Sequence, residues 1–99
     1  MTASIIGFVT LPESRTLEFK RDLSSLTPVL RTLVAFSNTA GGILVIGRED
    51  DGHIVGVPDP EREVERLASA VVDGIQPLLL PDIEIVDHEG KRLIVVKVA

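Results

Sequence analysis

The strongest structural signals of this 99-residue chain lie together in residues 35–57, AFSNTAGGILVIGREDDGHIVGV. Residues 43–46 form a short, unbroken apolar run with β-branched side chains, which predicts a strand buried on both faces. Residues 38–42 before it predict a helix end, because glycine adopts the left-handed conformation that ends helices. The dipeptide Asp51-Gly52 is a strong hairpin signal, and it predicts a second, antiparallel strand over residues 53–57.

The segment before this run predicts a strand followed by a helix. Residues 17–20 read as a short strand whose alternation places Glu18 and Lys20 on the same face. The dipeptide Thr27-Pro28 predicts a helix start, because the hydroxyl can cap the first N–H groups and proline lacks the N–H that a first turn leaves unpaired. This helix is expected to run to about Ser37.

The segment after residue 57 predicts a second helix and a second hairpin. Asp59-Pro60 repeats the helix-start signature, and an apolar stripe at spacings of three and four continues to Ile75. Residues 83–86 and 93–98 flank a turn at 88–91 and predict two paired strands. The predicted order is β-α-β-β-α-β-β, and we expect an α/β (α+β) domain of two layers, with a mixed sheet and the helices packed on one face.

Length and composition predict a single domain over residues 1–99. Aromatic residues make up 3% of the chain, so the core must consist of Leu, Ile, Val and Ala. The sequence ends at Ala99 on a strand without a polar tail, which predicts a piece cut from a longer protein, with its last strand left as a pairing edge. The absence of cysteine excludes disulfides and thiol catalysis and favours a cytoplasmic location. No stretch is long and apolar enough for a membrane span, so no membrane partner is expected.

The charge is distributed unevenly along the chain. The formal net charge is −5, but residues 1–48 hold five basic and three acidic side chains and therefore carry +2, which leaves −7 on residues 49–99. A polyanion is therefore expected to bind the first half, and the acidic second half is expected to face solvent.

Several motifs occur together in a specific order. These are ESRTLEFK (residues 13–20), AFSNTAGG (35–42), GREDDG (47–52) and IVGV (54–57). In this combination the chain resembles the Schlafen-type AlbA domain, also described as a divergent AAA domain, over residues 13–98. The resemblance implies an Alba-like fold that binds DNA or RNA, in a bacterial transcriptional regulator or a helicase-related protein.

The same resemblance implies, for some members, a metal-dependent nuclease with three acidic residues. At matching positions these are Glu13, Glu18 and Asp50, which would hold Mg²⁺ or Mn²⁺, with Lys20 contacting the scissile phosphate. The residues also allow a structural interpretation. Glu18 and Lys20 can form an ion pair on a strand face, Glu13 can be a loop carboxylate, and Asp50 can bond its own turn backbone. Arg48 departs from the small apolar residue that the family commonly has there.

Basic side chains of the first half are the candidate nucleic-acid contacts. With three Phe and no Trp or Tyr, base stacking is not expected to dominate, whereas phosphate contact independent of sequence is. Residues 38–42 follow a helix and lack Gly-Lys-Ser/Thr, so ATP is not expected as a cofactor. The predicted phosphate contacts are Arg15, Lys20, Arg21, Arg31 and Arg48.

Three functions remain open from the sequence. The first is a non-catalytic DNA- or RNA-binding module, and the second is a Mg²⁺- or Mn²⁺-dependent endonuclease. The third is a dimerisation or protein-interaction domain, which would use the acidic helix segment 61–66 or the terminal strand, and for which a homodimer is expected.

Overall fold

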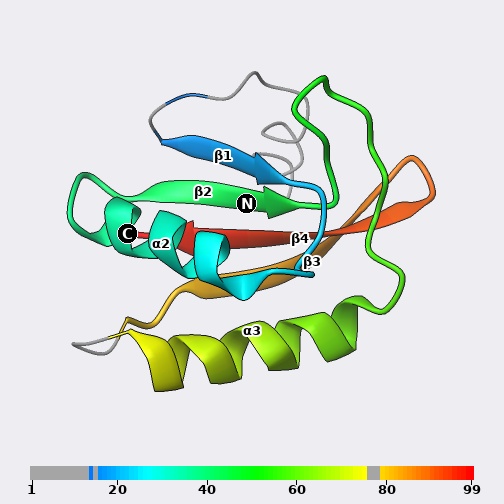
Figure 1. The fold of residues 1–99 in the computed structure, drawn as a ribbon. Coiled ribbons are helices and arrows are strands. Elements are labelled where there is room, and N and C mark those ends of the chain that lie inside the picture. The colour runs from blue at the N-terminus through cyan, green and yellow to red at the C-terminus, as the bar shows by residue number, and fades with distance from the viewer. Residues whose placement is uncertain (1–13, 15, 76–78) are drawn as a thin grey trace.

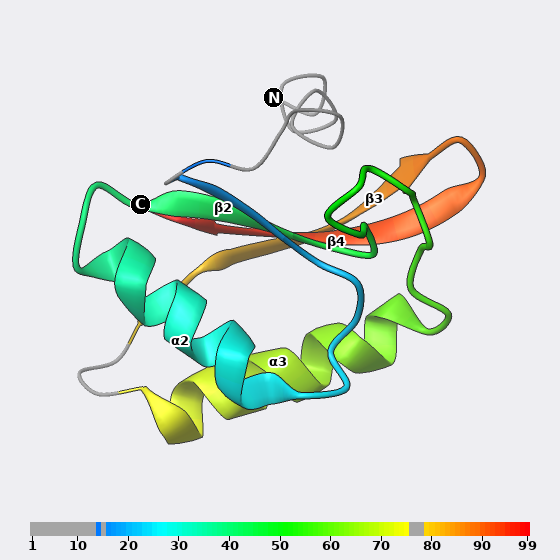
Figure 2. The ribbon, with the colours of Figure 1, turned by 45° about the horizontal axis from the view of Figure 1, so that its top comes forward.

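The structure, a computed structural model, describes residues 14, 16–75 and 79–99. The described elements are β1 (Leu17–Lys20), α2 (Leu26–Ser37), β2 (Gly42–Ile46), α3 (Pro60–Gly74), β3 (Asp82–His88) and β4 (Lys91–Val98). The four described strands form one sheet in the order β1-β2-β4-β3 (Figure 1). Both described helices lie on the same face of this sheet (Figure 2). The predicted α/β class, with two layers and a mixed sheet, is confirmed.

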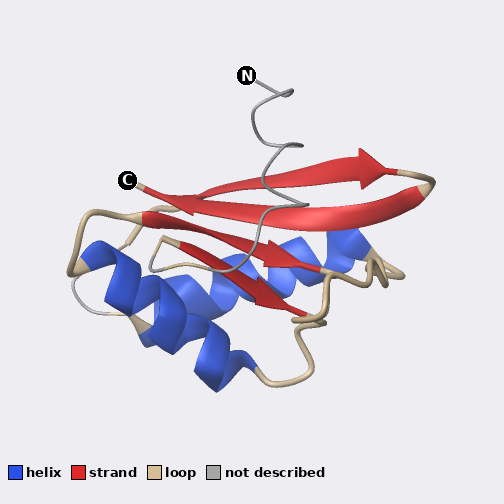
Figure 3. Cartoon of the chain, turned by 90° about the horizontal axis from the view of Figure 1, so that it is seen from above, coloured by secondary structure: helices blue, strands red, loops and turns tan. Residues whose placement is uncertain are grey.

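The pairing of the strands decides which chain segments meet. β1 pairs in parallel with β2, from Leu17 opposite Ile43 to Lys20 opposite Ile46. β4 is antiparallel to both β2 and β3. Because β1 and β2 run in the same direction, their carboxyl ends lie side by side at the same end of the sheet (Figure 3). The residues that follow them, Arg21 and Gly47, are therefore neighbours although 26 positions separate them in the sequence.

The strand predicted over residues 53–57 is wrong. This segment forms only an isolated bridge between Arg48 and Ile54, and the Val57 N–H donates to the carbonyl of Arg92 at 2.8 Å. The reason is competition, since β1 and β4 already occupy both edges of β2. In addition, Gly47 has φ +112°, which ends the extended backbone of β2 directly after Ile46. The described order is therefore β-α-β-α-β-β.

The prediction that the last strand is an open edge is also wrong. β4 lies between β2 and β3, where both of its sides are hydrogen bonded, and the edges of the described sheet are β1 and β3. The sequence pattern could not show this, because an apolar strand at the end of a chain suits an interior position as well as an edge. Self-association remains a prediction, without the terminal strand as its basis.

The helix boundaries follow most of the sequence signals. α2 begins at Leu26, with Ser25 as N-cap and no side-chain capping bond, so Thr27 lies inside the helix rather than before it. Pro28 is still within the first turn, where its missing N–H costs nothing. At the other end the chain turns through Gly41, whose φ of +89° confirms the predicted glycine stop. Asp59 caps α3 by accepting from the Arg62 N–H at 3.4 Å, as predicted.

The sheet has apolar side chains on both faces. On the helical face, Leu44, Ile46, Ile94 and Val96 pack with buried residues of both helices. On the outer face a second cluster joins all four described strands and consists of Leu17, Phe19, Val45, Val86, Leu93 and Val95. This explains why residues 43–46 are apolar without alternation. No helix within the described residues is long and apolar enough to cross a membrane.

Candidate functional site

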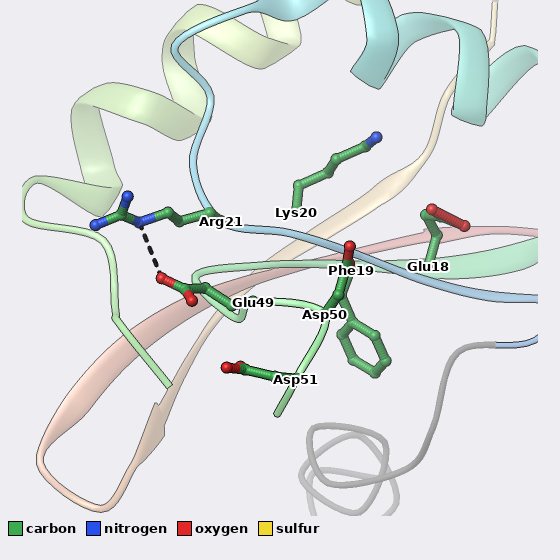
Figure 4. Close-up of a pocket in the computed structure, with 7 residues that line it drawn as sticks. All are labelled: Glu18, Phe19, Lys20, Arg21, Glu49, Asp50 and Asp51. Atoms are coloured by element: carbon green, nitrogen blue, oxygen red, sulfur yellow. Dashed lines mark ion pairs between the residues drawn. The ribbon is translucent and has the colours of Figure 1, made fainter. Parts of the chain in front are cut away.

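A pocket of about 540 Å³ lies at the shared carboxyl end of β1 and β2 (Figure 4). We call it the strand-end pocket, and seven residues line it: Glu18, Phe19, Lys20, Arg21, Glu49, Asp50 and Asp51. In open α/β sheets, ligands commonly bind outside the carboxyl ends of parallel strands, because the loops that follow these strands converge there. The pocket therefore occupies the position that the topology favours for a binding site.

Backbone hydrogen bonds hold the two halves of the pocket together. The carbonyl oxygen of Lys20 accepts from the Gly47 N–H at 2.8 Å and from the Arg48 N–H at 3.3 Å. These bonds fix the chain that leaves β2 against the end of β1. The segment that carries the acidic residues of the pocket is therefore anchored beside Lys20 and Arg21.

The acidic segment closes on itself as a tight turn. The Glu49 N–H donates to the His53 carbonyl at 2.9 Å, and the Gly52 N–H donates to the Glu49 carbonyl at 3.0 Å. Asp51 stabilises the turn, because its Oδ1 accepts from the His53 N–H at 2.9 Å. The structural role considered for Asp50 from the sequence is thus performed by its neighbour, Asp51.

The pocket has mixed charge, with four carboxylates and two cationic side chains among its lining residues. An ion pair crosses it, with Arg21 Nε at 3.4 Å from Glu49 Oε1, and the two side chains are 64% and 36% exposed. Such an exposed pair contributes little to stability, so it can open at low cost when a ligand competes for either partner. Lys20 extends away from Asp50 and Asp51 in Figure 4.

One carboxylate just outside the pocket is held in its charged form. Hydrogen bonds from the Ser24 hydroxyl at 2.7 Å and the Ser24 N–H at 3.0 Å lower the pKa of Asp22, with a smaller contribution from the Arg21 guanidinium. Asp22 therefore adds a permanent negative charge next to Arg21 at neutral pH. Together with the four lining carboxylates, it makes the surroundings of the two cations predominantly acidic.

Arg48 does not lie on the surface. Its side chain is buried, with 6% exposure, and its Cζ lies 3.6 Å from the centroid of the Phe19 ring. This is a cation–π contact on the outer face of the sheet, between β1 and the segment that follows β2. Arg48 is not among the residues that line the strand-end pocket, but it contacts Phe19, which is.

The structure brings some of the sequence-predicted site residues together and separates others. Glu18, Lys20, Arg21 and Asp50 line one pocket. Arg31 is exposed on α2 and lines a different pocket, between α2 and the end of α3. Glu13 and Arg15 lie outside the described residues. The five predicted phosphate contacts therefore do not all share one described surface, and only Lys20 and Arg21 among them line the strand-end pocket.

The described residues do not make a complete metal site. No group of three or more His, Cys, Asp or Glu side chains within the described ranges is close enough to hold a metal ion. Of the three acidic positions that the resemblance implies, Glu18 and Asp50 line the strand-end pocket, and the third, Glu13, is outside those ranges.

Three lining residues were not among the predicted site residues: Phe19 and the two acidic residues Glu49 and Asp51. A signal for the two acidic residues exists in the sequence, since a strand, a helix and a second strand in succession commonly form a parallel pair whose carboxyl ends meet. The acidic residues 49–51 directly follow such a strand. The ion pair between Arg21 and Glu49 has no comparable signal, because it depends on the exact register of β1 and β2.

Comparison with known proteins agrees with this fold. Residues 13–99 match the Schlafen AlbA_2 family, so the chain belongs to that family. Its structure is similar to the N-terminal domain of a Nitrosomonas europaea protein named as related to the ATP-dependent DNA helicase RecG. The TM-score is 0.76 at 30% identity, over 98% of this chain and 71% of that one. It also shares its fold with the DIP2311 protein of Corynebacterium diphtheriae, with a TM-score of 0.70 at 20% identity, over 98% of this chain and 24% of that one.

Proposed function

We propose that this chain is a nucleic-acid-binding module that contacts the phosphate backbone at the strand-end pocket. The main support is membership of the Schlafen AlbA_2 family together with the similarity to a domain of a RecG-related protein. The pocket supplies a suitable contact, because Lys20 and Arg21 are consecutive at the end of an edge strand. Consecutive cations at an edge of the described sheet can contact an extended polyanion without rearrangement of the core.

The electrostatics of the pocket predict weak binding that depends on salt. Two phosphate contacts correspond to a slope of about −2 for log affinity against log salt. The four carboxylates oppose the phosphates, so affinity is expected to be measurable mainly at low ionic strength.

Replacing the pocket cations tests the proposal. Lys20→Gln and Arg21→Gln are each expected to reduce the salt slope by about 1 and to weaken binding of different sequences equally. Fluorescence anisotropy with labelled single-stranded DNA, duplex DNA and RNA measures both quantities. Arg62→Gln is the matched control, because it removes the same charge from an exposed site on α3. The absence of wild-type binding at low salt, or an equal loss in the control, would refute the proposal.

Metal-dependent phosphodiester cleavage is a second candidate function. The observation that favours it is that Glu18 and Asp50 line the same pocket as Lys20. It predicts cleavage of single-stranded RNA or DNA that requires Mn²⁺ or Mg²⁺ and disappears in Glu18→Gln. Glu84→Gln, an exposed carboxylate on β3, should retain full activity. Cleavage that persists in Glu18→Gln, or that survives chelation by EDTA, excludes this function.

A further inference from the structure

Arg48 presents an unusual combination of burial and missing partners. The residue is 6% exposed, and its Nε and Nη1 atoms are inaccessible to solvent and without a hydrogen-bond partner among the described residues. Buried polar groups in proteins are nearly always hydrogen bonded, and a guanidinium cannot escape the problem by losing its proton. The side chain therefore retains its charge and unused hydrogen-bonding capacity in the interior.

The contact with Phe19 does not supply the hydrogen-bond acceptors that Arg48 lacks. The ring lies 3.6 Å from Cζ and so covers one face of the guanidinium plane. All N–H bonds of a guanidinium lie in its plane and point toward the edges, where a stacked ring offers no acceptor. The stacking orients Arg48 and compensates part of its charge, but it leaves the edge donors free to bind an anion.

The surroundings of Arg48 favour a phosphoryl group as that anion. Its backbone N–H donates to the Lys20 carbonyl, so Arg48 is anchored where Lys20 and Arg21 leave β1. Lys20 and Arg21 are thus close to Arg48 along the backbone, but the guanidinium of Arg48 lies over Phe19, on the face of β1 opposite to the Lys20 side chain. A phosphoryl group presents several charged oxygens, which suit the planar donor set of arginine in particular.

The turn of residues 49–53 covers this position. A Cβ on Gly52 would lie 3.4 Å from Arg48 Nη2, so the turn backbone runs close to the guanidinium. The turn also carries Glu49, Asp50 and Asp51, whose charges repel an anion while the turn stays in place. Entry of a phosphoryl group therefore requires this turn to move, and the exposed ion pair between Arg21 and Glu49 is a weak restraint on it.

We propose that Arg48 is the buried anchor of a phosphoryl-binding subsite beneath the turn of residues 49–53. The inference deepens the proposed function, on which it rests for its natural ligand, by assigning one backbone phosphate of a bound nucleic acid to this subsite. Free inorganic phosphate has the same chemistry and serves as the simplest probe.

Thermal unfolding of the whole chain with and without inorganic phosphate tests the subsite. Arg48→Met keeps an unbranched side chain against the Phe19 ring but removes the charge and all donors. Without phosphate, this variant should melt at least about 4 °C higher than the wild type, because an unpartnered buried cation has been replaced by an apolar group. Phosphate should raise the melting temperature of the wild type and of Arg62→Met, the exposed control, but not that of Arg48→Met.

Two results would overturn the subsite. One is that Arg48→Met melts below the wild type without phosphate, which would mean that the guanidinium is already satisfied. The other is that phosphate stabilises Arg48→Met as much as the wild type.

Anisotropy with labelled oligonucleotides separates the two sources of the phosphoryl group. If the subsite takes a backbone phosphate, Arg48→Met should bind about tenfold more weakly than the wild type. Unchanged binding would contradict the assignment to nucleic acid. If no oligonucleotide binds the wild type although phosphate stabilises it through Arg48, the proposed function fails and the subsite stands as a site for free phosphate.

Discussion

Leu67→Ala is expected to lower the free energy of unfolding by about 2–5 kcal/mol, as large-to-small substitutions in well-packed cores do. Leu67 is 0% exposed on α3 and belongs to the core cluster between the helices and the sheet. Its truncation removes apolar burial and leaves a cavity, because β2 and β4 are fixed by pairing on both sides and cannot collapse onto it. Urea unfolding followed by circular dichroism measures the loss.

Val72→Ala on the same helix is the control for this prediction. Val72 is 57% exposed, so its truncation should change stability by no more than about 0.5 kcal/mol. The two variants differ in the face of α3 that they alter. Similar losses in both would show that α3 packs on the sheet in a different rotation about its axis, and the fold described above would need revision.

Gly47→Ala is expected to destabilise the chain by about 2–5 kcal/mol, through backbone strain and overpacking together. Gly47 has φ +112°, which residues with a Cβ rarely adopt. The added Cβ would also lie 2.7 Å from Leu93 Cδ2, on a side chain that is itself 0% exposed, and 3.3 Å from the Gly56 Cα. Since the Gly47 N–H holds the end of β2 to Lys20, the strand-end pocket should be disturbed as well.

Gly90→Ala separates strain from packing in this comparison. Gly90, in the turn between β3 and β4, also has a positive φ, of +80°, but a Cβ there would meet no atom within 4 Å. Only the backbone cost of about 1–2 kcal/mol should remain. Chemical denaturation of both variants gives the difference. A loss at Gly47 no larger than that at Gly90 would contradict the close packing of Gly47 against Leu93.

The parts of the fold that the sequence predicted are those set by neighbouring residues. Asp59-Pro60 starts α3, the turn at Glu89 and Gly90 joins β3 to β4, and Gly41 ends the chain reversal after α2. Each of these depends on the conformational preference of one or two residues, which the sequence states directly. They are correct for that reason.

The strand order was not predictable in the same way, because it depends on competition between distant segments. Residues 53–57 have the composition of a strand, but β4 pairs with β2 over five residue pairs and leaves no open edge beside it. The local sequence pattern does not indicate which of two apolar segments will form more residue pairs with β2. The error concerning the terminal strand has the same origin.

The site was predicted in part for a related reason. Glu18, Lys20 and Asp50 were named from motifs, and the parallel pairing of β1 with β2 brings all three to one pocket. Arg48 was expected as a phosphate contact, whereas the structure buries it, which is rare for an arginine without a partner. Its burial depends on the Phe19 ring of the neighbouring strand, a contact across nearly thirty positions that composition does not reveal.

The strand-end pocket is built from β1 and from the turn that follows β2. Ligand binding therefore depends on β1 remaining paired with β2. β1 is a four-residue edge strand that pairs in the described sheet with β2 alone, so it is the smallest and least supported member of that sheet. A ligand that touches both Lys20 and the turn after β2 stabilises the docked form of β1 over any form in which β1 has detached. A substitution that weakens the packing of β1 in the outer-face cluster, for example at Leu17, would therefore reduce the affinity for the ligand without altering any atom that contacts it.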